Sequence, residues 1–123
     1  MANSPLNYVE VARQNDYFRQ TIATGEHSQI VVMTIPPAEE IGEETHDGDQ
    51  ILLFVEGEGE AVLEDETSPV RGGDLVFVPA GTKHNFVNTG SAPLRLVTVY
   101  APPEHPDGTV HRTKAEADAA EQH

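Results

Sequence analysis

Short hydrophobic stretches follow one another along most of the chain, and turn-forming residues separate them at a regular spacing. Ten glycines and nine prolines contribute to these breaks. Because short apolar runs with frequent turns are typical of β-sandwiches and barrels, the pattern predicts an all-β protein. The expected strands cover residues 17–21, 29–35, 43–46, 50–56, 60–64, 74–78, 84–88 and 93–100.

The segment from residue 50 to 55, Gln-Ile-Leu-Leu-Phe-Val, has apolar side chains on both faces of its expected strand. Such a strand needs cover on both sides, which an inner sheet of a sandwich or a subunit interface provides. Small β-sandwiches often cover an apolar outer face by pairing with a second copy. We therefore expect a homodimer.

Turn and capping residues predict where the strands connect and where the sheet ends. The sequence Glu-Gly-Glu-Gly-Glu at residues 56–60 is typical of a tight turn and predicts a hairpin between its flanking strands. Prolines at residues 102–106 end the sheet, and Thr-Lys-Ala-Glu at residues 113–116 predicts a short C-terminal helix. We expect an N-terminal segment at 1–16, a barrel at 17–102 and a C-terminal loop and helix at 103–123.

The amino-acid composition excludes some classes of binding partner and of chemistry. The 123 residues include 21 acidic and 7 basic ones, which gives a formal net charge of -14, and no cysteine. This charge opposes binding to nucleic acid and anionic membranes, and the lack of cysteine excludes disulfides and thiolate chemistry. The longest apolar run, residues 51–55, is too short to span a membrane, and the first residues lack the pattern of a signal peptide. We expect a soluble cytoplasmic protein.

The acidic residues are unevenly distributed. Between Arg19 and Arg71 there is no basic residue, and 13 of the 21 acids lie there. Two interpretations remain open: a solvated acidic surface, including one adapted to high salt, or a field that gathers cations toward a site.

Candidate metal ligands lie in two places. Glu44 and His46 stand two residues apart, so a strand would place both on one face, and Gln50 opens the next strand. His84 opens another strand directly after the turn Pro-Ala-Gly-Thr at residues 79–82. Imidazole and carboxylate suit transition metals. Histidines beside acids on an ordinary surface would give the same local pattern.

The spacing around His84 resembles a known family. Gly73-x5-Pro79-x-Gly81-x2-His84-x3-Asn88 matches the second motif of the cupin superfamily at every fixed position. In the first cupin motif, anchored on Gly57, the chain has His46 at the second histidine position. It departs from that motif at three positions, with Ala38 for the leading glycine, Glu44 for the first histidine and Gln50 for the glutamate.

The resemblance implies a cupin-type jelly-roll barrel. In addition, residues 101–111 look like the corresponding segment of small bacterial cupins that are called mannose-6-phosphate isomerase-like. It also implies a divalent transition metal, Fe, Mn, Ni, Zn or Cu, held by four residues: Glu44, His46, Gln50 and His84. This set has the same total charge as the usual three histidines and one glutamate. Its two histidines and one carboxylate also resemble the facial set of non-haem iron sites. A cupin that has lost its metal is the alternative.

Period-two alternation places apolar side chains beside these polar ones. Leu52 and Phe54 share a face with Gln50, and Phe86 shares one with His84, so these three are expected to wall a pocket as well as fill the core. Arg19 and Met33 are further candidates for the interior, although their strand registers are open. The side chains expected to be exposed are those of His27, His105, His111 and His123 in loops or tails, and Lys83 and Asn85 beside His84. For His105 the alternative is that its loop folds over the mouth of the barrel.

Two functions follow from this reading. The first is an enzyme, of dioxygenase or isomerase type, that acts on a small oxygenated substrate through the metal; no residue is assigned as catalytic. The alternative is a non-catalytic module that binds or senses a small molecule or a metal. In both cases the expected partner is a small molecule.

Overall fold

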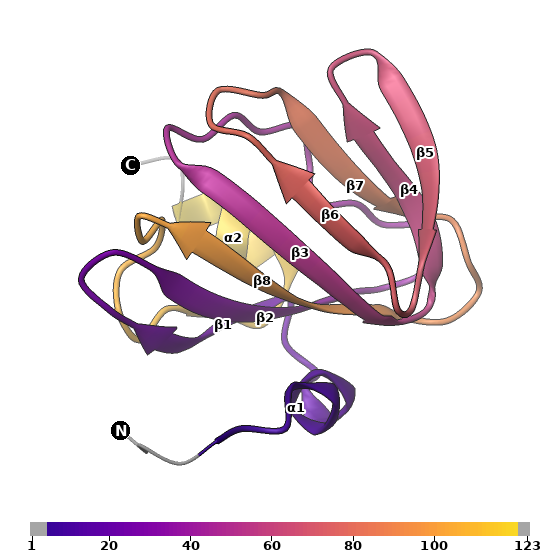
Figure 1. Cartoon of the computed structure of the whole chain (residues 1–123). Coiled ribbons are helices and arrows are strands. Elements are labelled where there is room, and N and C mark those ends of the chain that lie inside the picture. The colour runs from indigo at the N-terminus through magenta and orange to yellow at the C-terminus, as the bar shows by residue number, and fades with distance from the viewer. Residues whose placement is uncertain (1–4, 121–123) are drawn as a thin grey trace.

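The computed structural model describes residues 5–120 (Figure 1). Within that range the chain forms nine strands and two short helices. In chain order they are α1 (Tyr8–Gln14), β1 (Arg19–Thr24), β2 (Gln29–Ile35), β3 (Asp49–Glu56), β4 (Glu58–Leu63), β5 (Glu66–Arg71), β6 (Leu75–Val78), β7 (His84–Asn88), β8 (Leu94–Ala101), β9 (Val110–His111) and α2 (Lys114–Ala120). No helix among the described residues is long and apolar enough to cross a membrane.

The strands form two antiparallel sheets. One has the order β6-β3-β8-β2-β1-β9 and the other has the order β5-β4-β7 (Figure 1). Alternation along each strand turns one set of side chains inward. In β3, for example, Gln50, Leu52 and Phe54 are buried, whereas the residues between them are only partly covered. The predicted all-β jelly-roll fold is confirmed.

The predicted strands match the structure closely, with two additions and one loss. β5 and β9 were not expected, and residues 43–46 form no strand. Glu44 is instead joined to His84 by an isolated bridge, with both backbone N···O distances at 2.9 Å. This bridge still brings the two candidate segments together.

The turn at residues 56–60 differs from the prediction in a way that matters for topology. β3 and β4 on its two sides do not form a hairpin, because β3 pairs with β6 and β8, and β4 pairs with β5 and β7. Gly57, with φ of 100°, is the point where the chain passes from one sheet to the other. A Cβ there would lie 2.5 Å from the carbonyl oxygen of Pro93, so glycine is required.

Both ends of the described chain are helical. The predicted C-terminal helix is present as α2, where Thr113 Oγ1 accepts a hydrogen bond from the Glu116 backbone N–H at 3.2 Å. Helix α1 was not predicted. Asn7 caps it by accepting from the backbone N–H of Glu10 at 3.0 Å, and Ala12 packs on the outer face of the larger sheet against Val32 and Val97.

α1 covers only part of that outer face, and the homodimer remains a prediction. A groove of about 410 Å³ stays open there, lined by Leu6, Tyr8, Val11, Ile22, Ile30, Leu53, Val97 and Val99. We expect light scattering to give twice the chain mass of 13.3 kDa, and Ile30→Glu to shift the protein toward the monomer because it places a charge in the groove. Leu75→Glu, which changes an exposed side chain outside the groove, is the matched control. A monomeric wild-type protein would contradict the prediction.

Candidate metal centre

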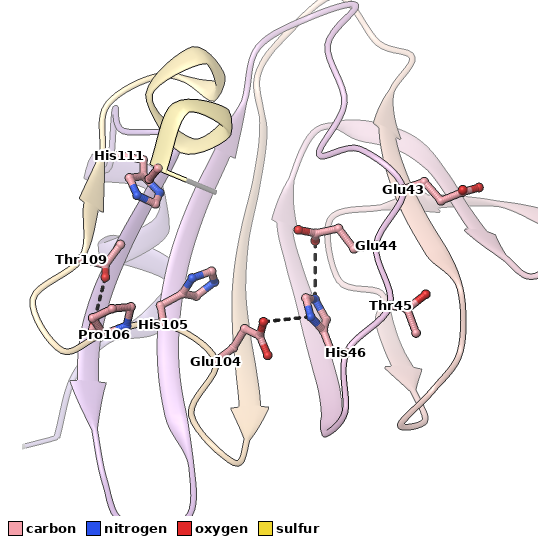
Figure 2. Close-up of a pocket in the computed structure, with 10 residues that line it drawn as sticks. Glu43, Glu44, Thr45, His46, Glu104, His105, Pro106, Thr109 and His111 are labelled. Carbon is pink, nitrogen blue, oxygen red and sulfur yellow. Dashed lines mark hydrogen bonds and ion pairs between the residues drawn. The ribbon is translucent and has the colours of Figure 1, made fainter. Parts of the chain in front are cut away.

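Glu44, His46 and His84 converge at one end of the barrel. The first two lie on the segment between β2 and β3, and His84 is the first residue of β7. One ligand atom from each of the three lies within 4.8 Å of the others. The rings of His46 and His84 are 5.1 Å apart between centroids, and Figure 2 shows Glu44 pointing toward His46. Three of the four expected ligands are therefore neighbours.

Neighbouring oxygens orient both imidazoles. His84 Nδ1 lies 2.8 Å from the carbonyl oxygen of Thr82, which can only accept, so Nδ1 donates and carries the proton. His46 Nδ1 lies 3.2 Å from Glu104 Oε2, so its proton is held in the same way. In each ring the lone pair of Nε2 is then left for another group.

Both Nε2 atoms are buried without a hydrogen-bond partner among the described residues. Glu44 Oε1 is 3.5 Å from His46 Nε2, which is too long for a strong hydrogen bond. Buried polar atoms are almost always paired in folded proteins. Two unpaired imidazole nitrogens beside a carboxylate are the donors expected around a metal ion.

Gln50 shows the same feature. Its side chain is buried on the inner face of β3, and its Nε2 donates to Thr98 Oγ1 at 3.1 Å. That bond fixes the orientation of the amide, and Oε1 is left buried without a hydrogen-bond partner in the part of the chain described. The role of Gln50 as a fourth ligand remains a prediction.

The cupin domain profile matches residues 31–100, which contain the whole cluster. The chain belongs to the cupin family. This cupin is 42% identical to the YrkC protein of Bacillus subtilis over 123 residues, which covers 94% of this chain and 66% of YrkC. The chain thus spans about two thirds of that relative. The likeness to mannose-6-phosphate isomerase-like cupins remains a prediction.

Two further likenesses bear on the fold and on the site. The crystal structure of BH2720 from Bacillus halodurans superposes with a TM-score of 0.93 and 40% identity, over 96% of this cupin and 95% of that chain. An acireductone dioxygenase of Parvibaculum lavamentivorans is 39% identical over 69 residues, which covers 52% of this cupin and 37% of the dioxygenase. That match covers only about half of this cupin.

Burial and neighbouring charges set the protonation of the cluster. Burial alone would raise the pKa of Glu44, but contact with His46 and the charges of His46 and Arg19 outweigh it and lower that pKa. Burial lowers the pKa of His84. It would also lower that of His46, but the carboxylates of Glu44 and Glu104 raise it instead. At neutral pH Glu44 is ionised and His84 is neutral, which are the forms that coordinate metals. The two carboxylates favour the protonated form of His46, so a metal would displace that proton when it binds.

The cluster opens into a cavity of about 530 Å³ that is lined mostly by residues with polar or charged side chains (Figure 2). Its lining consists of Glu43, Glu44, Thr45, His46, Glu104, His105, Pro106, Thr109, His111 and Ala120. The apolar residues expected to wall it, Leu52, Phe54 and Phe86, are buried in the main core instead. Phe86 still adjoins the cluster, because its ring lies 5.9 Å from that of His84 between centroids.

The C-terminal loop supplies the part of the site that sequence reasoning missed. His105 and His111 were expected to be exposed, but they are half-buried and line the cavity. Asn85 is also half-buried, because its side chain accepts from the Gly42 N–H and donates to Glu40. His27 and Lys83 are exposed as expected, Arg19 and Met33 are buried, and His123 lies outside the described residues.

Gln29 fixes that loop over the barrel. Its buried side chain accepts from the backbone N–H groups of Glu104 at 3.2 Å and His105 at 3.0 Å, and it donates to the carbonyl of His105 at 2.7 Å. Three hydrogen bonds from one buried amide hold the two residues at fixed positions beside His46. Their side chains therefore belong to a pre-organised site.

Proposed function

We propose that this cupin binds a divalent transition metal through Glu44, His46 and His84, with Gln50 as fourth ligand. The observation that carries the proposal is the convergence of Glu44, His46 and His84, with both Nε2 atoms buried and without a hydrogen-bond partner within residues 5–120. Gln50 Oε1 is likewise buried without a hydrogen-bond partner in that range. A bound cation would satisfy all three atoms, and the carboxylate of Glu44 would offset part of its charge.

The donor set favours redox and Lewis-acid chemistry over a purely structural role. Two imidazoles and one carboxylate with open positions are the facial set of non-haem iron oxygenases, and they also suit Mn, Ni, Zn and Cu. When bound, such a metal polarises oxygen ligands or activates dioxygen. The cavity of about 530 Å³ beside the cluster has room for a small molecule.

We infer that the reaction is of the dioxygenase type and acts on a small oxygenated substrate. Support comes from the two-histidine, one-carboxylate cluster and from the partial likeness to an acireductone dioxygenase. Glu44 is unsuited to serve as a free base if it binds the metal, and Glu104 is already paired with His46. Neither of these two carboxylates is then free to transfer a proton in an isomerase reaction.

Oxygen uptake tests this function. The Fe²⁺-loaded protein is mixed with small aliphatic diketones and enediols, and oxygen consumption is followed with an electrode beside product analysis. We expect consumption that depends on substrate and disappears in His84→Ala. Turnover without oxygen would point to an isomerase, and binding without turnover would point to a non-catalytic binding or sensing module; either result would overturn the dioxygenase assignment.

Glu104 is expected to contribute to metal affinity without being a ligand. Its carboxylate holds His46 Nδ1, so Glu104→Gln weakens the control of ring orientation and lowers the basicity of Nε2. We expect metal affinity to fall by roughly 10–100-fold in calorimetric titration with Mn²⁺ or Ni²⁺. Glu43→Gln, which removes an exposed carboxylate from the same cavity wall, is the matched control. Equal losses in the two variants would indicate a general charge effect instead.

A further inference from the structure

Arg19 is a buried cation inside the barrel. It lies at the start of β1, and only 1% of its surface is exposed. Its Nη1 is 3.2 Å from His111 Nδ1, and its guanidinium lies 5.2 Å from the centre of the Phe18 ring. Within residues 5–120 it forms no ion pair with a carboxylate, and its buried Nε has no hydrogen-bond partner.

Such an arginine is unusual on energetic grounds. A guanidinium stays protonated at all relevant pH values, so it cannot avoid the desolvation penalty by losing its charge. Buried charges are therefore normally paired with an opposite charge. Neither an imidazole nor an aromatic ring supplies a full negative charge. The charge of Arg19 lowers the pKa of Glu44 from a distance, but no described carboxylate contacts its guanidinium, which is thus prepared for an anion in direct contact.

The cavity next to His111, the contact of Arg19, contains a second group without a hydrogen-bond partner. His105 Nε2 is buried without a partner among the described residues, and the backbone of His105 is fixed by Gln29. Burial and then the charge of Arg19 lower the pKa of His105 to about 4, so the ring is neutral at neutral pH. Figure 2 shows His105 and His111 on one side of the cavity and Glu44 and His46 on the other.

Arg19 does not itself line the cavity, but it contacts His111, which does. We propose that Arg19, behind His111, and His105 form an anion-binding end of the cavity and that the substrate carries a carboxylate there, while its other oxygen atoms face Glu44, His46 and His84. The planar fork of a guanidinium matches the two oxygens of a carboxylate. A phosphate fits less well, because its higher charge would lie in a cavity that also contains Glu44 and Glu104. The substrate class is therefore a small oxo or hydroxy carboxylic acid.

This inference rests on the proposed function, and a pair of probes tests it. Pyruvate and its neutral amide, pyruvamide, have nearly the same shape and differ in the charge of one group. Calorimetric titration of the Mn²⁺-loaded protein is expected to show pyruvate binding roughly tenfold or more tightly than pyruvamide. Arg19→Met is expected to abolish that preference while bound metal stays at the wild-type level. Arg112→Met, which changes an exposed arginine, should leave the preference intact.

The wild-type protein gives a second readout in case Arg19→Met does not fold. In a ¹⁵N-labelled sample the Nε–H signal of Arg19 is expected to shift on addition of pyruvate and to remain unchanged with pyruvamide. A signal unmoved by both compounds would overturn the inference. So would an unchanged pyruvate preference in folded Arg19→Met protein.

The same titrations without metal separate this inference from the proposed function. A wild-type protein that retains no metal contradicts the proposed function alone. Pyruvate binding to that metal-free protein that is lost in Arg19→Met would still support the anion-binding end. Metal retention without any preference for pyruvate contradicts the anion-binding end and leaves the metal site standing.

Discussion

Replacing His84 with alanine is expected to remove most metal binding and leave a folded protein. His84 contributes one of the two buried Nε2 atoms, and the Thr82 carbonyl already orients its ring, so His84→Ala removes a pre-oriented ligand. The loss of a metal ligand lowers metal affinity more than the loss of a residue that only orients a ligand. We therefore expect the metal affinity of His84→Ala to drop by roughly 100-fold or more. His46→Ala removes the other Nε2 atom and should have a similar effect.

Metal analysis after dialysis measures this effect directly. Wild-type and variant proteins are loaded with the same metal, dialysed together and analysed by inductively coupled plasma mass spectrometry, and circular dichroism confirms that each is folded. His27→Ala is the matched control, because the His27 side chain is 88% exposed and lies outside the cluster. Full metal occupancy in both His84→Ala and His46→Ala would refute the assigned ligands.

The centre of the site was predictable because its geometry is mostly local. Glu44 and His46 are only two residues apart and lie close together even though residues 43–46 form no strand, and the turn at residues 79–82 leads directly into His84. The backbone bridge between Glu44 and His84 then joins the two segments. Here the relevant contacts follow from short-range spacing and from one family motif.

The remaining part of the site depends on contacts between distant parts of the chain. Glu104 and His105 reach the cavity only because Gln29, some 75 residues earlier in the chain, binds their backbone. A proline-rich segment gives no periodicity from which such a return could be predicted. Arg19 illustrates a different difficulty: its inward orientation depends on the register of β1, which local pattern leaves open.

The fold, like the site, was predictable from the sequence where the signal is local and not where it depends on distant contacts. Alternating apolar residues predicted the inner strands, but β5, with the sequence Glu-Thr-Ser-Pro-Val-Arg, buries only Val70 and therefore lacks that signal. Gly57 lies between β3 and β4 as a turn residue should, whereas Gly59 lies inside β4. Turn residues report only local backbone geometry, so they could not show that the chain changes sheets there.

Phe86→Ala is expected to destabilise the protein by about 3–5 kcal/mol. The Phe86 side chain is fully buried, and its ring lies 5.8 Å from that of Phe54 and 5.9 Å from that of His84. Truncation removes the contact between the core and the metal cluster and leaves a cavity beneath His84. Since domains of this size are stable by only about 5–15 kcal/mol, the loss is a large share of the total.

Urea denaturation of the metal-free protein measures this loss without a contribution from bound metal. Phe77→Ala is the matched control, because Phe77 lies on edge strand β6 and is 53% exposed, so its truncation should cost less than about 1 kcal/mol. Similar midpoints for Phe86→Ala and wild-type protein would show that Phe86 does not carry the packing under the cluster. A large loss in Phe86→Ala together with weaker metal binding in its folded form would show that the core beneath His84 also holds that ligand in position.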